Sequence, residues 1–257
     1  MNTGGRNKKL CEELPVVNFM GARLHAATME ETVAVIARRI ERDIFTQHVV
    51  LNVAKMVNMR TDPVLRKSVL SCDIINADGM GVVWGARIKG INIPERVAGV
   101  DLFQKLLKMS AEKKFPVFFL GALPEVVEET ARRMQQKFPG LIVAGYHHGY
   151  FWDDEQTVVD MIKKSGAYLL FVAITSPKKE NFINRWQEQL GARFVMGVGG
   201  AFDVMAGKVK RAPKWMQNVG LEWFYRVIQE PGRMWKRYLK TNTQFLWMLL
   251  TRQKIAS

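Results

Sequence analysis

The chain has 257 residues, of which 48% are hydrophobic, and it carries a formal net charge of +14. This length allows one large domain with a full hydrophobic core that needs neither disulfides nor a structural metal for stability. Cys11 and Cys72 are the only cysteines and form no C-x-x-C pair, which argues against a disulfide framework and a structural zinc site and indicates a reducing compartment.

The N-terminal residues are positively charged but lack the apolar core of a secretory signal, so residues 1–14 are expected to form a mobile tail. A helix that spans a bilayer needs about 18 or more consecutive apolar residues. The longest late apolar run covers only residues 245–250, so no membrane-spanning helix is predicted.

Strand-like and helix-like segments alternate from Pro15 to about Val204. A capping box formed by Thr28 and Glu31 predicts the start of the first helix, and Pro124, Asp153 or Asp154, and Ser176 with Pro177 mark three later helix starts. Several strand-like runs are apolar throughout, which is typical of buried parallel strands. The predicted strands cover residues 48–53, 73–78, 116–121, 141–146, 167–174 and 193–199. This alternation predicts an α/β fold with a Rossmann-like, mainly parallel sheet sandwiched by helices.

Unusual short motifs follow several of these strands, where ligands gather in open parallel sheets. They are NADG (76–79), LGA (120–122), HHGYF (147–151), ITSPKKE (174–180) and GVGGAFD (197–203). Neither glycine run completes a dinucleotide fingerprint, because Phe202 and Trp84 replace the last glycine, and there is no P-loop sequence. Nicotinamide cofactors and P-loop nucleotide hydrolysis are therefore not predicted.

No essential metal and no cofactor are predicted. The chain contains no D-x-D pair, residues 153–155 (DDE) read as a helix start, and adjacent His147 and His148 point to opposite faces if they end a strand. A diphosphate could instead be neutralised by Lys178, Lys179 and the amides of the helix that starts near Pro177.

Asp78 has two interpretations. Asp-Gly is a common turn dipeptide, and on the first interpretation Asp78 and Gly79 form only a turn. Its position at a strand end, within 25 residues of Arg96 and Asp101, also suits a carboxylate that accepts a proton from a hydroxyl nucleophile.

Positive charge is concentrated after residue 207. Eleven Lys or Arg residues stand against two Glu between Lys208 and Ser257, together with four of the seven tryptophans. Such a mixture suits an anionic membrane surface or a nucleic acid, and composition does not separate them. Pro231 and Gly232 are expected to divide residues 224–250 into two helices, with apolar stripes over Phe224, Val227, Ile228, Trp235, Tyr238, Leu239, Phe245, Leu246, Leu249 and Leu250. Helices of this kind lie on a membrane, although an ordinary basic helical cap is the alternative.

The order of these motifs resembles the WecG/TagA/CpsF glycosyltransferases, glycosyltransferase family 26. The resemblance covers about residues 15–240 and rests on NADGMGVVW…ERVAGVDL, FLGA, GYHHGYF, GAYLLFVAITSPKKE, MGVGGAFDVMAGKVKRAP and GLEWFYRVIQEP. It implies a GT-E type fold with a mobile tail (1–14), a catalytic core (15–207) and a basic membrane-associating appendage (208–257). It also implies metal-independent, inverting transfer from a UDP-sugar to a polyprenyl-diphosphate-linked sugar at the cytoplasmic face of the inner membrane, and it leaves a homo-oligomer open.

The same resemblance implies roles for individual residues. Asp78 matches the proposed catalytic base, and Arg226 and Arg233 match arginines of the appendage that close over the active site; Lys236 and Arg237 beside them are assigned to the acceptor diphosphate and the membrane. Donor or substrate contacts are expected from Asn52, Asn76, Gly79, Arg96, Asp101, Lys179, Glu180, Gly199, Gly200 and Asp203. For the two glycines, a purely conformational role in a tight turn is the alternative.

Two departures bear on the donor sugar. Val50 and Lys179 stand where teichoic-acid members of the family carry threonine and glutamine, so two neutral hydrogen-bonding groups are lost. We therefore expect glucose as the donor sugar, as in the GumM-like exopolysaccharide glucosyltransferases of the family, with N-acetylmannosamine or its uronic acid as the alternative. A nucleic-acid-binding protein and a catalytically idle membrane protein of the same fold are the rival interpretations.

Overall fold

The computed structural model describes residues 14–251 and 253–255. The predicted N-terminal tail lies outside this range apart from Leu14, which is buried. Cys11 also lies outside it, whereas Cys72 is a buried free thiol.

A six-stranded parallel sheet forms the centre of the protein, in the order β4-β3-β8-β7-β5-β6. A separate antiparallel hairpin, β1 (Val16–Phe19) and β2 (Ala22–His25), precedes it. The sheet strands are β3 (Thr46–Leu51), β4 (Ile74–Ala77), β5 (Val117–Gly121), β6 (Val143–His147), β7 (Leu169–Ala173) and β8 (Phe194–Gly197). The predicted Rossmann-like parallel fold is confirmed.

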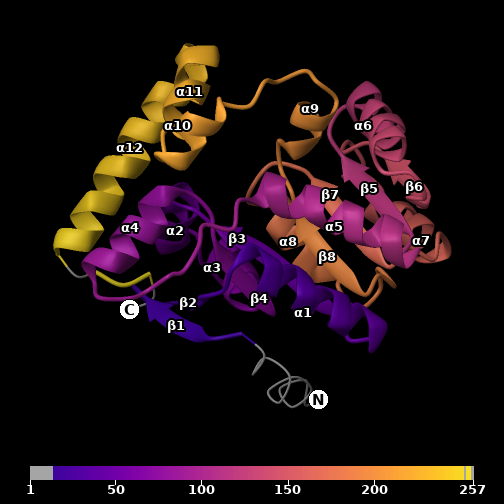
Figure 1. Ribbon diagram of the computed structural model, residues 1–257, viewed down its shortest axis with the longest axis horizontal. Helices are drawn as coiled ribbons and strands as arrows, with labels where there is room; N and C mark the ends of the chain where they lie inside the picture. The colour runs from indigo at the N-terminus through magenta and orange to yellow at the C-terminus, as the bar shows by residue number, and fades with distance from the viewer. Residues whose placement is uncertain (1–13, 252, 256–257) are drawn as a thin grey trace.

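Helices cover both faces of this sheet (Figure 1). They are α1 (Met29–Glu41), α2 (Val53–Thr61), α3 (Pro63–Leu70), α4 (Met80–Ile88), α5 (Gly99–Lys113), α6 (Pro124–Lys137), α7 (Glu155–Lys164), α8 (Lys178–Trp186) and α9 (Ala201–Met205). The Thr28–Glu31 capping box is present at α1, and Asp154 caps α7. The prediction that Ser176 caps the next helix is wrong, because α8 starts one residue later and Pro177 occupies its N-cap without a side-chain hydrogen bond.

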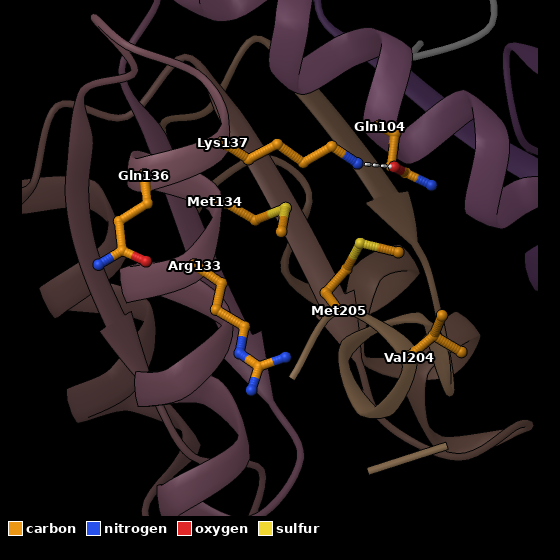
Figure 2. Close-up of a pocket in the computed structure, with 7 residues that line it drawn as sticks. All are labelled: Gln104, Arg133, Met134, Gln136, Lys137, Val204 and Met205. Atoms are coloured by element: carbon orange, nitrogen blue, oxygen red, sulfur yellow. Dashed lines mark hydrogen bonds between the residues drawn. The ribbon is translucent and has the colours of Figure 1, made fainter. Parts of the chain in front are cut away.

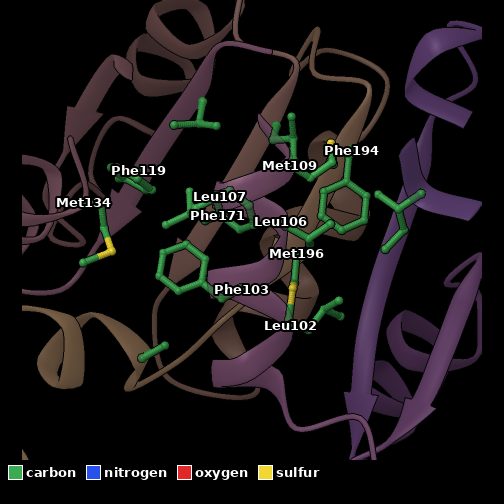
Figure 3. Close-up of a cluster of buried hydrophobic side chains, with 14 of the residues drawn as sticks. Leu102, Phe103, Leu106, Leu107, Met109, Phe119, Met134, Phe171, Phe194 and Met196 are labelled. Atoms are coloured by element: carbon green, nitrogen blue, oxygen red, sulfur yellow. The ribbon is translucent and has the colours of Figure 1, made fainter. Parts of the chain in front are cut away.

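Aromatic side chains fill the core between the sheet and the layer that contains α5, α6 and α9 (Figure 3). Phe103 of α5 lies edge-on to Phe171 of β7, with ring centroids 4.7 Å apart, and also contacts Phe119 and Phe202. Burial of such large apolar side chains is the main favourable term in folding. It fixes the strand ends on which the site residues stand.

The C-terminal segment forms α10 (Lys214–Asn218), α11 (Glu222–Gln229) and α12 (Pro231–Leu250). The predicted break near Pro231 is confirmed. These helices lie beside α2 and α4 (Figure 1), and α12 packs on α2. None of the helices in the described range is both long and apolar enough to cross a membrane.

The far end of α12 belongs to a buried cluster of the core. Phe245, Met248 and Leu249 are buried together with Phe19, and a side chain at Gly85 of α4 would collide with Phe245. The sequence pattern predicted that Phe245 and Leu249 belong to a lipid-facing stripe. This prediction is wrong, because both side chains are buried in the core. Trp235, Leu239, Leu246 and Leu250 of the same helix are exposed.

Candidate active site

Asp78 stands at the end of β4, where the chain turns into α4. Its backbone N–H donates to the carbonyl of Leu51 at the end of β3, over 2.8 Å. Gly79 follows with a φ of 92°, a conformation that favours glycine, and a Cβ built there would meet nothing within 4 Å. Both residues are partly exposed and lie at the carboxyl edge of the sheet.

Four charged side chains act on the Asp78 carboxyl. Burial raises its pKa above the ordinary value, and the negative charge of Glu222 adds to this effect. The positive charges of Arg96, Arg226 and Lys55 oppose it. A raised pKa strengthens a carboxylate as a proton acceptor, which suits general base catalysis.

Arg96 reaches this edge through a loop that is tied to β4. The N–H of Val97 donates to the carbonyl of Ala77 over 3.0 Å, which places Arg96 near Asp78. The Nη1 atom of Arg96 lies 3.2 Å from Oε2 of Glu222, the first residue of α11. The core and the C-terminal helices therefore meet at the predicted base.

Asn52 and Asn76 differ in position. The side chain of Asn52 caps α2 by accepting from the N–H of Lys55 over 2.9 Å, and Asn52 is partly exposed at the strand edge. Asn76 is fully buried, with Oδ1 2.9 Å from Nε2 of His48 and Nδ2 3.3 Å from Oγ1 of Thr32. The predicted contact of Asn76 with the substrate does not agree with this position, because its amide is used inside the core.

The hydrogen-bonded network around Asn76 is uncharged at neutral pH. Burial lowers the pKa of both His25 and His48 to about 4. Nδ1 of His25 accepts from the N–H of Ile75 over 3.0 Å, which links the hairpin to β4. This network supports β4 beneath Asp78.

A buried cluster of two lysines and one glutamate lies below the ends of β3 and β8. Lys55 and Lys179 place their Nζ atoms 3.0 and 2.9 Å from Oε1 of Glu180, and Lys55 also donates to the carbonyl of Val50 over 2.8 Å. A Cβ at Gly197 would lie 2.9 Å from the Lys179 side chain, so glycine permits this close approach. Two cations share one carboxylate, and the cluster therefore carries net positive charge.

The pKa values in this cluster follow from its burial. Burial and repulsion from Lys55 lower the pKa of Lys179 to about 8. Burial opposes ionisation of Glu180, but Lys55 and Lys179 together lower its pKa to about 2. Glu180 therefore remains ionised as the counterion of both lysines. Its predicted role in donor binding is at most indirect, because only 3% of its surface is exposed.

Asp101 in the first turn of α5 pairs with an arginine that the sequence analysis did not single out. Arg211 donates to Oδ1 and Oδ2 of Asp101 over 2.5 and 3.1 Å. Burial works against ionisation of Asp101, but these bonds outweigh it and hold its pKa below the ordinary value. Asp101 therefore links the core to the C-terminal segment, and its contact with the donor stays a prediction.

The glycine turn after β8 is open. Gly199 has a φ of 53°, Gly200 is the N-cap of α9, and a Cβ at Gly199 would meet nothing within 4 Å. The carbonyl of Asp203 accepts from the N–H groups of Lys208 and Val209. These observations support the conformational role of Gly199 and leave its nucleotide contact a prediction.

The C-terminal helices carry further cations that act on Asp78 and on Lys179. Arg226 acts on Asp78, and Arg237, which is exposed, acts on Lys179 and lowers its pKa further. Lys236 is exposed, with its Nζ 5.9 Å from the ring centroid of Trp235. Arg233 lies in α12, but its side chain is outside the described part of the structure.

Two other observations concern ligand sites. Among residues 14–251 and 253–255, no group of three or more His, Cys, Asp or Glu side chains is arranged to hold a metal ion. An open pocket of about 570 Å³ lies between α5, α6 and α9 (Figure 2), lined by Gln104, Arg133, Met134, Gln136, Lys137, Val204 and Met205. This lining includes none of the predicted site residues whose side chains are described.

Lys55, Arg211 and Glu222 are the site residues that sequence reasoning missed. Lys55 lies three residues after Asn52, in the first turn of a helix that starts at a strand end, which was an available signal. Glu222 precedes Arg226 by four residues, so both lie on one face of α11. The partnership of Arg211 with Asp101 spans 110 residues and has no local signal.

A parallel sheet with a carboxylate of raised pKa and several cations at its strand ends is an arrangement that suits an enzyme acting on anionic substrates. A model of the Glycosyl transferase WecG/TagA/CpsF family matches residues 17–257. The chain belongs to this family, and the protein is a glycosyltransferase.

Two relatives share the name N-acetylglucosaminyldiphosphoundecaprenol N-acetyl-beta-D-mannosaminyltransferase. The chain is similar to the protein of Bacillus spizizenii, with 41% identity over 184 residues that cover 72% of this chain and 69% of the relative. It is also similar to that of Bacillus subtilis, with 38% identity over 179 residues that cover 70% of this chain and 69% of the relative.

Proposed function

We propose that the protein transfers N-acetylmannosamine from its UDP derivative to N-acetylglucosamine carried on a polyprenyl diphosphate. The names of both relatives support this donor and this acceptor. They favour the alternative donor of the sequence analysis over glucose, and they give no support to a role in exopolysaccharide synthesis.

The structure explains why Val50 and Lys179 are weak indicators of glucose. Val50 is a core residue, 8% exposed, whose methyl group would lie 3.3 Å from a Cβ at Gly99. The Lys179 ammonium is bound to Glu180. Valine and lysine at these positions therefore give little support for glucose.

In the proposed reaction Asp78 takes the proton of the acceptor hydroxyl. The acceptor oxygen attacks the anomeric carbon from the face opposite UDP, a new C–O bond forms, and the bond to the UDP oxygen breaks with its electron pair leaving on UDP. This single displacement inverts the anomeric centre. The observation that carries this assignment is the partly exposed carboxylate at the end of β4, which has a raised pKa and lies within the influence of Arg96 and Arg226.

Cations of the chain are proposed to stabilise the departing UDP without a metal. Arg96 and Arg226 act on the Asp78 carboxyl, and Arg237 is an exposed cation of α12 that acts on Lys179. Fixed positive charge in a partly buried site stabilises charge that develops on a leaving group.

Release of UDP by the purified protein in detergent with EDTA tests this function. We expect release from UDP-N-acetylmannosamine that depends on polyprenyl-diphosphate N-acetylglucosamine and survives EDTA. UDP-glucose and the uronic acid of UDP-N-acetylmannosamine serve as competing donors in parallel reactions. Release from UDP-glucose alone would contradict the donor, loss of release with EDTA would contradict metal independence, and no release from any donor would favour an idle protein.

The exposed apolar face of the C-terminal helices supports a peripheral position on a membrane. Trp235, Leu239, Leu246 and Leu250 follow one side of α12, since their spacing of four, seven and four residues repeats the helical period. Lys236 and Lys240 are exposed on the same helix and would add attraction to anionic lipid. Truncation after Gly207 does not test this cleanly, because it would also remove Phe245 and Met248 from the core.

Replacement of Leu239 and Leu246 by glutamate is therefore expected to reduce binding to anionic liposomes at least about tenfold, because each change removes apolar insertion and adds repulsion. Sedimentation with vesicles of anionic and of neutral lipid measures this effect. Ile142, which is 44% exposed just before β6, gives the control Ile142→Glu. If the variant with glutamate at positions 239 and 246 bound liposomes as well as the Ile142→Glu control, the proposed membrane-binding face of α12 would be contradicted. Salt-sensitive binding to DNA or RNA instead would favour the nucleic-acid alternative.

A further inference from the structure

Four charged side chains form an alternating chain between α5 and the predicted base. Asp101 binds Arg211, the Nε of Arg211 lies 3.3 Å from Oε1 of Glu222, and Oε2 of Glu222 lies 3.2 Å from Nη1 of Arg96. The side chains of Arg96, Arg211 and Glu222 are only 15%, 13% and 17% exposed. Partial burial makes such pairs stronger and more specific in geometry than pairs on the surface.

Glu222 occupies the central position of this chain. Each of its carboxylate oxygens faces a different arginine, one from the core and one from the segment that leads into the C-terminal helices. Glu222 opens α11, and Arg226 follows one turn later on the same face. The bonds of Glu222 therefore fix both Arg96 and the start of the helix that carries Arg226.

We propose that Glu222 is a positioning residue for glycosyl transfer, which fastens α11 to the core, holds Arg96 beside Asp78 and sets the place of Arg226. This inference rests on the proposed function of Asp78 as the base. It makes docking of the C-terminal helices a condition for the correct charge around the reacting hydroxyl. Glu222 acts through Arg96 and Arg226, so it is a positioning residue and not itself a catalytic residue.

The negative charge of Glu222 also affects the pKa of Asp78. The charged groups that act on Asp78 are Arg96 from the loop before α5, Lys55 from α2, and Glu222 and Arg226 from α11. Glu222 raises the pKa of Asp78, while the three cations lower it. Loss of the Glu222 charge would therefore lower the pKa of Asp78.

The test compares Glu222→Gln, which keeps the shape and removes the charge, with the wild-type protein. We expect kcat with UDP-N-acetylmannosamine to fall on the order of tenfold to a hundredfold, because a small displacement of Arg96 and Arg226 misplaces charge at the leaving group. We also expect the acidic limb of the kcat/KM profile to move to lower pH by about half a unit or more. Glu188→Gln, on the exposed surface near the end of α8, is the control of equal charge and should change neither quantity.

Two additional variants make the result decisive. Glu222→Asp keeps the charge with a shorter reach, so it should retain the acidic limb of the wild type while losing part of kcat. Arg211→Met combined with Glu222→Gln should cost less than the sum of the single changes, because both interrupt one chain of contacts. If Glu222→Gln fails to fold, Arg211→Met removes one of the two partners of Glu222 and should still lower kcat, and an unchanged kcat in this variant would overturn the proposal.

An unchanged kcat and pH profile in a folded Glu222→Gln protein would overturn the proposal. A lower kcat with an unmoved acidic limb would assign Glu222 a structural role only and would overturn it as well. Failure of the proposed function is distinguished by a wild-type protein without activity, or by an Asp78→Asn variant that retains it.

Discussion

Replacement of Asp78 by asparagine is expected to lower kcat by about 10² to 10⁴, the range typical for loss of a general base. The amide keeps the size of the carboxylate but cannot accept the proton of the acceptor hydroxyl. Because the change leaves the backbone turn at Gly79 intact, UDP affinity and the unfolding midpoint should stay close to wild type. Steady-state UDP release, together with calorimetric titration of UDP, measures both quantities.

The pH profile gives an independent check on Asp78. The base acts in its deprotonated form, so activity should fall as the pH drops through its pKa, which burial places above the ordinary value for aspartate. The wild-type protein should show this acidic limb, and the residual activity of Asp78→Asn should lack it. Near wild-type turnover by a variant that still binds UDP would show that Asp78 serves only the turn.

Replacement of Glu180 by glutamine is expected to lower the free energy of unfolding by about 3–5 kcal/mol. This is the range for removing one partner of a buried ion pair, and here the loss leaves Lys55 and Lys179 without their shared counterion. Urea denaturation at pH 7 measures the effect. Glu188→Gln, with an exposed side chain, should change stability by no more than about 0.5 kcal/mol.

The deficit of Glu180→Gln should narrow as the pH rises from 7 to 10. Glu180 raises the pKa of Lys179, so its loss lets this buried lysine release its proton at lower pH in the folded variant than in the folded wild type. The unfolded state then binds more protons than the folded variant, and the stability of the variant rises with pH more than that of the wild type. Adding Lys55→Met to the variant should restore part of the lost stability, since it removes one uncompensated charge. A deficit independent of both pH and Lys55 would show that the cluster is not held by charge.

The position of α12 shows the limit of patterns read along one helix. The stripe that includes Phe245 and Leu249 is amphipathic, and the sequence does not say whether an apolar face meets lipid or protein. In the structure these two side chains pack with Phe19 from the hairpin, which comes from the other end of the chain. The hairpin itself escaped prediction because its strands have only four residues each and its turn, Met20–Gly21, lacks the Asn-Gly or Asp-Gly signal.

The sequence by itself determined the alternating strands and helices, the capped start of α1 and the strand-end position of Asp78. These features depend on local periodicity and on turn chemistry, which act over a few residues. Its ordered motifs also identified the glycosyltransferase family, which the match over residues 17–257 confirmed.

Only the tertiary structure decided which charges meet at the site. Asp101 lies 110 residues from Arg211, and Arg96 lies 126 residues from Glu222, so no local rule relates them. Asn76 lies in β4 and Asp78 follows the end of the same strand. The Asn76 amide is hydrogen-bonded inside the core, whereas Asp78 is partly exposed at the edge of the sheet. Burial and pairing are properties of the packed chain, and they decide which of the polar residues lie together as a candidate base, its neighbouring cations and the bonds that hold these cations in place.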